Sequence, residues 1–198
     1  MDLHGKHIIL ASGSPRRREL LKGLDIDFEI DTNNNFKEHF SPETPFDEVP
    51  ALMSEGKSLG FHRPLEEGEI LITSDTMVIL PPLPGKPGEI LGKPKDREDA
   101  CRMLRDLSGR SHHVITAVTL RDSARKETFT ATTEVWFKNL SEEEISYYID
   151  KYKPFDKAGA YAIQEWIGHI GITRIEGSYF NVVGFPVQRV YEALLRFI

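Results

Sequence analysis

The residues best suited to chemistry lie in the stretch ASGSPRRR, residues 11–18, which follows a short apolar run. Ser14 is a favourable helix N-cap and Pro15 suits the first helical position, so a helix is predicted to begin here. Its first turn carries three arginines, although a cation near a helix N-terminus costs about 0.3–1 kcal/mol. Hydroxyls, free amide donors and guanidinium groups are what a polyphosphate needs. The stretch therefore predicts an anion site, with an exposed basic helix start as the alternative. The chain contains no GxxxxGK[ST] loop.

A second candidate is the polar triplet Ser74, Asp75 and Thr76 inside the apolar stretch ILITSDTMVIL, residues 70–80. The apolar residues on both sides indicate a buried strand. A carboxylate in such a place is costly unless a cation, hydrogen bonds or a metal pair with it. We therefore expect Asp75 to be a functional carboxylate at the end of a core strand. The alternative is a solvated aspartate at a strand end.

The elements that must position these groups follow from the spacing of apolar residues and from capping signals. Strands are predicted at residues 8–10, 28–30, 70–80, 90–91, 112–121 and 127–137, the last two forming a hairpin. Helices are predicted to begin near residues 14–15, 48–50, 95, 141 and 186, with Asp96 capping the third and Ser141 and Glu144 forming a capping box at the fourth. In the second helix, Leu52, Met53 and Leu59 are expected on the buried side, and Val187, Val190, Tyr191, Leu194 and Leu195 are expected to form the core face of the last. The mixture indicates an α/β or α+β protein with a mixed, twisted sheet.

Length and composition agree with a globular protein. The 198 residues favour one domain, or one domain with two lobes, and the net charge of −6 argues against nucleic-acid binding through bulk electrostatics. Cys101 is the single cysteine, which excludes an intramolecular disulfide. The N-terminus shows no signal-peptide pattern, and no apolar stretch approaches the ~18 residues of a membrane span. We expect a cytoplasmic protein that binds neither nucleic acid nor membrane.

The stretch LASGSPRRRELL resembles the signature of the Maf-like nucleotide pyrophosphatase family, and nearly the whole chain keeps to the order of that family. KAGAYAIQ and GSYFNVVGFP are similar to the branch of the family that acts on dTTP and UTP. The resemblance implies a single domain over residues 1–198, with two lobes and a cleft around an elongated, twisted mixed sheet. This architecture is similar to the inosine triphosphate pyrophosphatase fold.

The resemblance also implies a reaction, which is hydrolysis of the α–β phosphoanhydride of dTTP or UTP to the nucleoside monophosphate and pyrophosphate. Asp75 would be the catalytic carboxylate, acting as proton acceptor. The residues expected to bind the phosphates are Ser12, Arg16, Lys57 and Lys93, and those expected to select the base are Arg17, Thr76 and Gln164. A glutamine amide donates and accepts at once, so it can read the carbonyl and ring NH of a pyrimidine together.

A divalent metal, Mg²⁺ or Mn²⁺, is expected at Glu38 and Asp75, because magnesium usually takes one or two protein carboxylates plus substrate phosphates. The chain departs from the family's pattern at two places. Lys37 stands where many members have the first residue of an acidic pair, and Glu165 and Trp166 follow Gln164 where glycine is frequent. If those two side chains faced the base, the substrate preference would shift.

Two other functions are consistent with these residues. One is the same hydrolysis of 7-methyl-GTP or of a modified nucleotide. The other is a nucleotide-binding regulator of septum formation, a role that would need the phosphate-binding residues but not Asp75. The expected partner is a nucleoside triphosphate, and a homodimer is the expected assembly.

Overall fold

The computed structural model describes residues 3–198, which contain a seven-stranded sheet. Its strand order is β2-β1-β3-β5-β6-β7, and β4 pairs with β3. The strands are β1 (His7–Leu10), β2 (Glu29–Ile30), β3 (Glu69–Leu80), β4 (Glu89–Leu91), β5 (Ser111–Arg121), β6 (Lys126–Phe137) and β7 (Ile172–Glu176). Parallel pairs (β1 with β2 and β3) and antiparallel pairs (β3 with β4, β6 with β7) occur together, which confirms the predicted mixed sheet.

The helices are α1 (Pro15–Lys22), α2 (Val49–Leu59), α3 (Arg97–Leu107), α4 (Glu142–Tyr152), α5 (Trp166–Gly171), α6 (Tyr179–Val183) and α7 (Val187–Phe197), with a 3-10 turn at Ala158–Ala160. None of the helices among the described residues has the length and apolar character needed to cross a membrane. The capping predictions are confirmed at α1, where the Ser14 hydroxyl accepts from the Arg17 amide. They are also confirmed at α4, where Ser141 and Glu144 form a capping box.

The chain divides into two compact units. The first unit holds residues 1–75, 116–131 and 184–198, and the second holds residues 76–115 and 132–183. Strands β3, β5 and β6 each contribute residues to both. The prediction of one domain over the whole chain stays a prediction.

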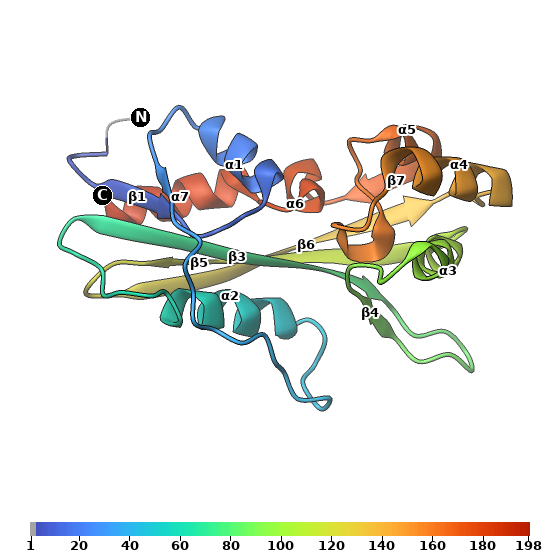
Figure 1. Ribbon diagram of the computed structural model, residues 1–198, viewed down its shortest axis with the longest axis horizontal. Coiled ribbons are helices and arrows are strands. Elements are labelled where there is room, and N and C mark those ends of the chain that lie inside the picture. The colour runs from blue at the N-terminus through green and yellow to red at the C-terminus, as the bar shows by residue number, and fades with distance from the viewer. Residues whose placement is uncertain (1–2) are drawn as a thin grey trace. The chain divides into compact units, whose positions relative to one another are not determined.

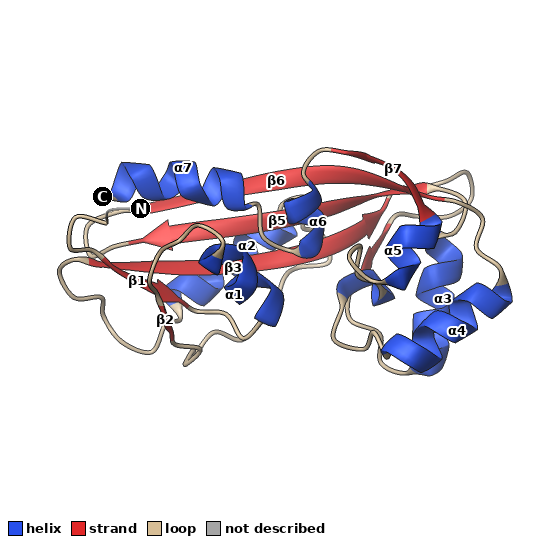
Figure 2. Cartoon of the chain, turned by 90° about the horizontal axis from the view of Figure 1, so that it is seen from above, coloured by secondary structure: helices blue, strands red, loops and turns tan. Residues whose placement is uncertain are grey.

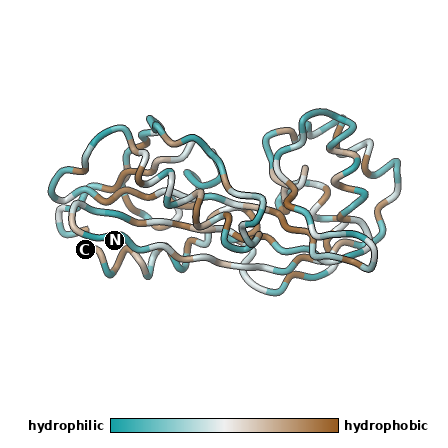
Figure 3. The backbone as a smooth tube through the Cα atoms, turned by 90° about the horizontal axis from the view of Figure 1, so that it is seen from below, coloured by the Kyte–Doolittle hydropathy of each residue, from teal (hydrophilic) through white to brown (hydrophobic). Residues whose placement is uncertain are grey.

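In the first unit, α1 and α7 cover one face of the sheet and α2 covers the other (Figures 1 and 2). Side chains alternate between these faces along each strand. Ile70 and Ile72 pack with α1 and α7, whereas Leu71 packs on the opposite face with Phe61 and Leu65. Hydrophobic residues accordingly recur along the strands in Figure 3, and the loops are more hydrophilic.

The predicted buried sides of two helices were partly wrong. Met53 of α2 is buried as expected, but Leu52 and Leu59 are exposed. The buried residues of α2 are Val49, Pro50, Met53, Ser54 and Ser58. In α7, Tyr191 and Leu195 are exposed, and the buried residues are Val190, Ala193, Leu194 and Phe197. Helix α2 turns the small residues Ser54 and Ser58 toward the sheet, whereas α7 buries the large side chains of Leu194 and Phe197 beside Ala193.

In the second unit, α3 and α4 pack together against the sheet. Their buried residues include Leu104, Leu107, Ile145 and Tyr148. Within this core the ring of His112 hydrogen-bonds the Tyr161 hydroxyl at 2.7 Å. Residues 155–185, to which the sequence assigned no elements, form α5, β7, α6 and the 3-10 turn.

Candidate functional site

Asp75 lies in the interior of the twelve-residue strand β3, so the prediction that it ends a core strand was wrong. Its side chain is 14% exposed and accepts a hydrogen bond from the Lys57 ammonium at 2.5 Å. An ion pair of this kind offsets the cost of placing a carboxylate in a buried strand. The strand continues past Asp75 because antiparallel pairing with β4 satisfies its backbone over Val78–Leu80.

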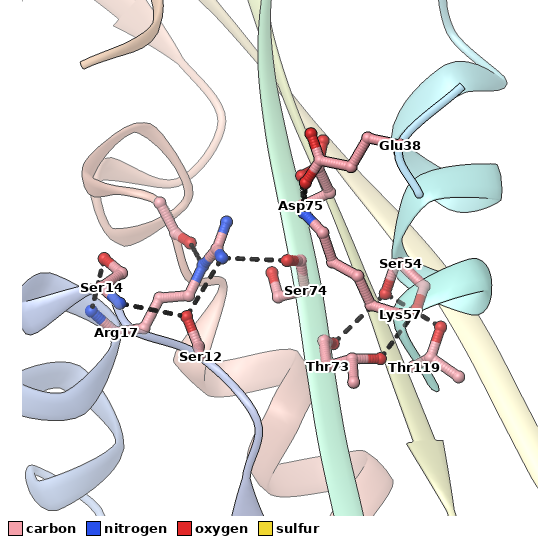
Figure 4. Close-up of polar contacts among 11 residues, drawn as sticks. Ser12, Ser14, Arg17, Glu38, Ser54, Lys57, Thr73, Ser74, Asp75 and Thr119 are labelled. Atoms are coloured by element: carbon pink, nitrogen blue, oxygen red, sulfur yellow. Dashed lines mark hydrogen bonds and ion pairs between the residues drawn. The ribbon is translucent and has the colours of Figure 1, made fainter. Parts of the chain in front are cut away.

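Glu38 contacts the same ammonium. Its carboxylate lies 2.9 Å from Lys57 Nζ, although the Glu38 side chain itself is 64% exposed. Two carboxylates and one lysine therefore converge at one point between α2 and β3 (Figure 4). Both carboxylates contact the same ammonium, so they are close enough to bind a second cation together. They would also lie beside any phosphate group that Lys57 binds.

The position of α2 on the sheet is set by reciprocal hydrogen bonds one helical turn before Lys57. The Ser54 hydroxyl donates to the Thr73 carbonyl at 3.2 Å, and the Thr73 hydroxyl donates to the Ser54 carbonyl at 2.8 Å. Ser54 also hydrogen-bonds Thr119 at 2.9 Å, and all three side chains are fully buried (Figure 4). Thr73 and Asp75 lie on the same face of β3, so these bonds fix both halves of the ion pair.

The segment that carries Glu38 is held against α2 by close contact at two glycines. A Cβ added at Gly56 would lie 2.2 Å from the Phe36 ring, and one added at Gly60 would lie 2.6 Å from Phe36 Cβ. Asn34 also donates to the Lys57 carbonyl at 2.6 Å. Only glycine permits Phe36 to approach α2 so closely. Because Glu38 follows Phe36 by two residues, this approach brings the Glu38 carboxylate near Lys57.

Arg17 and Ser12 lie on the other side of β3 from Lys57 (Figure 4). The Arg17 guanidinium donates to the Ser74 carbonyl at 2.9 Å, the Gly184 carbonyl at 3.0 Å and the Ser12 hydroxyl at 3.3 Å. Burial is the main cause that lowers the pKa of Arg17 to about 10, while the nearby Asp75 opposes the shift. Arg17 thus keeps its charge at neutral pH. Arg16 is half-buried and its charge also acts on Arg17.

Six of the predicted site residues belong to the first unit. Five of them lie around the middle of β3, namely Ser12, Arg17, Glu38, Lys57 and Asp75, and the sixth is Arg16 in the first turn of α1. Three others, Thr76, Lys93 and Gln164, belong to the second unit. Within that unit, the loop of Lys93 joins the KAGAYAIQ segment, because the Gly92 carbonyl accepts a hydrogen bond from the Gly159 amide at 3.0 Å. Lys93 and Gln164 are both exposed.

Glu165 and Trp166, the departures noted in the sequence, contact α4. The Tyr148 hydroxyl donates to the Glu165 carboxylate at 2.5 Å, and the Trp166 ring packs edge-on against Tyr147 with ring centroids 4.7 Å apart. The site is also shaped by Ser54, Thr73 and Phe36, none of which was predicted from the sequence. A usable signal was the spacing of small residues in and just after α2: Ser54 and Ser58 lie one turn apart on one side, and Gly56 and Gly60 lie one turn apart on another.

Known proteins resemble the chain over nearly its full length. Residues 7–197 match the family model of Maf-like proteins. A Bacteroides thetaiotaomicron protein named dTTP/UTP pyrophosphatase is 47% identical over 98% of this chain and 97% of its own length. A Flavobacterium psychrophilum protein of the same name is 49% identical over 95% and 93%.

The Ham1 protein of Staphylococcus aureus has a similar fold, with a TM-score of 0.51 and 17% sequence identity over 97% of this chain and 99% of that one. This likeness concerns the fold alone and supports the predicted mixed α/β architecture. The match to the family model and the identity to the curated relatives agree with the resemblance that the LASGSPRRRELL stretch carries. The chain belongs to the family of Maf-like proteins.

Proposed function

We propose that the chain is a nucleoside triphosphate pyrophosphatase that hydrolyses dTTP and UTP to the nucleoside monophosphate and pyrophosphate. The observation that carries this proposal is the identity of 47–49% to relatives named dTTP/UTP pyrophosphatase, over nearly the whole of both chains. The convergence of Lys57, Asp75 and Glu38 at one point supports a hydrolytic centre there.

In the proposed reaction, water adds to one phosphorus of the α–β anhydride and the bridging P–O bond breaks. Asp75 accepts the proton of the attacking water, which requires that its carboxylate exchange the contact with Lys57 for the water. The released Lys57 ammonium then neutralises charge on the phosphate groups, together with Arg16, Lys93 and the Ser12 hydroxyl. Water attack and charge neutralisation thus draw on the same ion pair.

Glu38 and Asp75 would hold a divalent metal, Mg²⁺ or Mn²⁺. Two carboxylates that share one cation provide the hard oxygen ligands that these metals prefer. The described residues contain no group of three or more His, Cys, Asp or Glu side chains that suits a metal, so substrate phosphates and water would complete the ligands. When bound, the metal would neutralise phosphate charge.

Base selection is proposed for Arg17, Thr76 and Gln164. Gln164 is exposed and its amide offers a donor and an acceptor to a pyrimidine ring. Arg17 is anchored by three acceptors of its own chain, which supports a fixed contact rather than a mobile one. The cytoplasmic location and the homodimer stay predictions.

Pyrophosphate release from dTTP, UTP, CTP and 7-methyl-GTP with Mg²⁺ tests the proposal. We expect release from dTTP and UTP that falls by about 10²–10⁴-fold in Asp75→Asn. Asp106→Asn is the matched control, because Asp106 forms an equally short 2.5 Å pair with Lys86 outside the site, and it should keep full activity. Preference for 7-methyl-GTP would overturn the base assignment. Nucleotide binding without cleavage would overturn the hydrolase and favour a regulatory protein.

A further inference from the structure

Gln164 lies in a tight turn formed by residues 162–165. The Glu165 amide donates to the Ala162 carbonyl at 3.1 Å, which closes the turn and leaves Gln164 as its third residue. Ala162 and Ile163 are buried, whereas Gln164 is exposed. Gln164 is therefore the most exposed side chain of the turn.

One phenol oxygen holds both ends of this turn. The Tyr148 hydroxyl accepts from the Ala162 amide at 3.2 Å and donates to the Glu165 carboxylate at 2.5 Å. Tyr148 comes from α4 and is fully buried. Burial, reinforced by the hydrogen bond to Glu165, raises the pKa of Tyr148, so the hydroxyl keeps the proton that it donates. Loss of this single oxygen would remove one hydrogen bond from each end of the turn.

Two further features hold the turn in place. The Lys157 ammonium lies 3.4 Å from the Glu165 carboxylate, and the Lys157 side chain is only 11% exposed. Gly168 of α5 approaches the turn so closely that an added Cβ would lie 1.8 Å from the Ile163 carbonyl oxygen. The turn is therefore tied to α4, to the KAGAYAIQ segment and to α5.

A rigid turn matters for base selection because a glutamine amide is ambiguous. In one orientation it matches the carbonyl and ring NH of uracil or thymine, and in the reversed orientation it matches the amino group and ring nitrogen of cytosine. A turn that moves can bring the amide to either base in either orientation, so a fixed backbone at Gln164 is a requirement for discrimination. A loose turn would accept both bases.

We propose that Tyr148 and Glu165 are positioning residues that confer pyrimidine selectivity by fixing the turn of Gln164. This inference rests on the proposed function. It explains the departure at Glu165: its carboxylate does not select the base directly but secures the neighbouring residue that does.

The test is the ratio of kcat/KM for dTTP over dCTP in Tyr148→Phe, which removes only the hydroxyl. We expect the ratio to fall by about 10-fold, through a higher KM for dTTP with kcat within about 3-fold of the parent value. Glu165→Ala should act in the same direction, and Glu165→Gln, which keeps an acceptor for the phenol, should restore most of the ratio. Tyr152→Phe, on the same helix and stacked on Tyr148, is the matched control and should leave the ratio unchanged.

Gln164→Ala separates the two proposals. If Gln164→Ala lowers the ratio while Glu165→Ala and a folded Tyr148→Phe do not, the positioning role is overturned and the base assignment stands. If Gln164→Ala leaves the ratio unchanged, the base assignment is overturned and the positioning role with it. If Tyr148→Phe does not fold, the two Glu165 variants decide the question.

Discussion

Lys57 and Asp75 form an ion pair of 2.5 Å that joins the last turn of α2 to the interior of β3. Both side chains are largely buried, with 22% and 14% of their surfaces exposed. Water can therefore compensate little of the charge of Asp75 while Lys57 holds this contact, and the proposed reaction requires that Lys57 give way to the attacking water. The pair therefore contributes both to the stability of the first unit and to the proposed chemistry.

Replacing Lys57 with glutamine should affect both properties. We expect Lys57→Gln to lower the free energy of unfolding by about 1–3 kcal/mol, because a buried carboxylate loses its cation. Pyrophosphate release should fall by about 100-fold or more, since the phosphates lose a positive charge. Urea unfolding and a pyrophosphate assay measure the two effects.

Lys86→Gln is the control for this substitution. Lys86 pairs with Asp106 at the same distance but is 48% exposed, so its loss should cost less than about 1 kcal/mol and leave turnover unchanged. Wild-type turnover in Lys57→Gln would remove Lys57 from the proposed site.

Gly56→Ala should destabilise the protein, although glycine to alanine inside a helix usually stabilises by about 0.5–1 kcal/mol. The added methyl would lie 2.2 Å from the Phe36 ring, which must move and take the Glu38 segment with it. We expect a loss of about 1–3 kcal/mol in the free energy of unfolding, measured by urea titration, together with reduced turnover.

The double variant Gly56→Ala/Phe36→Ala tests the cause. If the clash is responsible, removal of the Phe36 ring should make the alanine at position 56 neutral or stabilising relative to Phe36→Ala alone. A Gly56→Ala effect that is the same in both backgrounds would contradict the close-packing explanation.

His112 should make the protein sensitive to acid. Burial, with the nearby charges of His113 and Arg110, lowers the pKa of His112 to about 3, below its ordinary value of 6.5. The unfolded state therefore binds a proton that the folded state does not. Above about pH 6.5, His112 does not change the free energy of unfolding. As the pH falls from 6.5 towards 3, the free energy of unfolding decreases by up to about 1.4 kcal/mol per pH unit.

His112→Gln keeps a hydrogen-bonding group beside Tyr161 but does not titrate. Urea titrations at pH 7, 6, 5 and 4 should show a shallower loss of stability in His112→Gln than in the parent protein. His39→Gln, at an exposed position, is the control and should follow the parent curve. Parallel curves for His112→Gln and the parent would contradict this prediction.

Local signals in the sequence predicted several elements correctly. Ser14 and Pro15 predicted the start of α1, Asp96 predicted the N-cap of α3, and Ser141 with Glu144 predicted the capping box of α4. Such signals work because a cap bonds a backbone amide two or three residues away, so the relevant partners are adjacent in the chain. The buried strand β3 was also predicted correctly, from the apolar residues on both sides of its polar triplet.

The sequence by itself also named the candidate chemical groups, because an arginine cluster at a helix start and a carboxylate within an apolar strand are conspicuous wherever they occur. Their partners depended on the tertiary structure. Arg17 bonds the carbonyl of Gly184, 167 residues away, and Ser54 bonds Thr119, 65 residues away. The inward face of α2 was misjudged for the same reason: Ser54 bonds to Thr73 and Thr119, and no local pattern shows that the two predicted strands carrying them lie against this helix. Contacts between distant segments exist only once the chain has folded, and they decide which side chains meet.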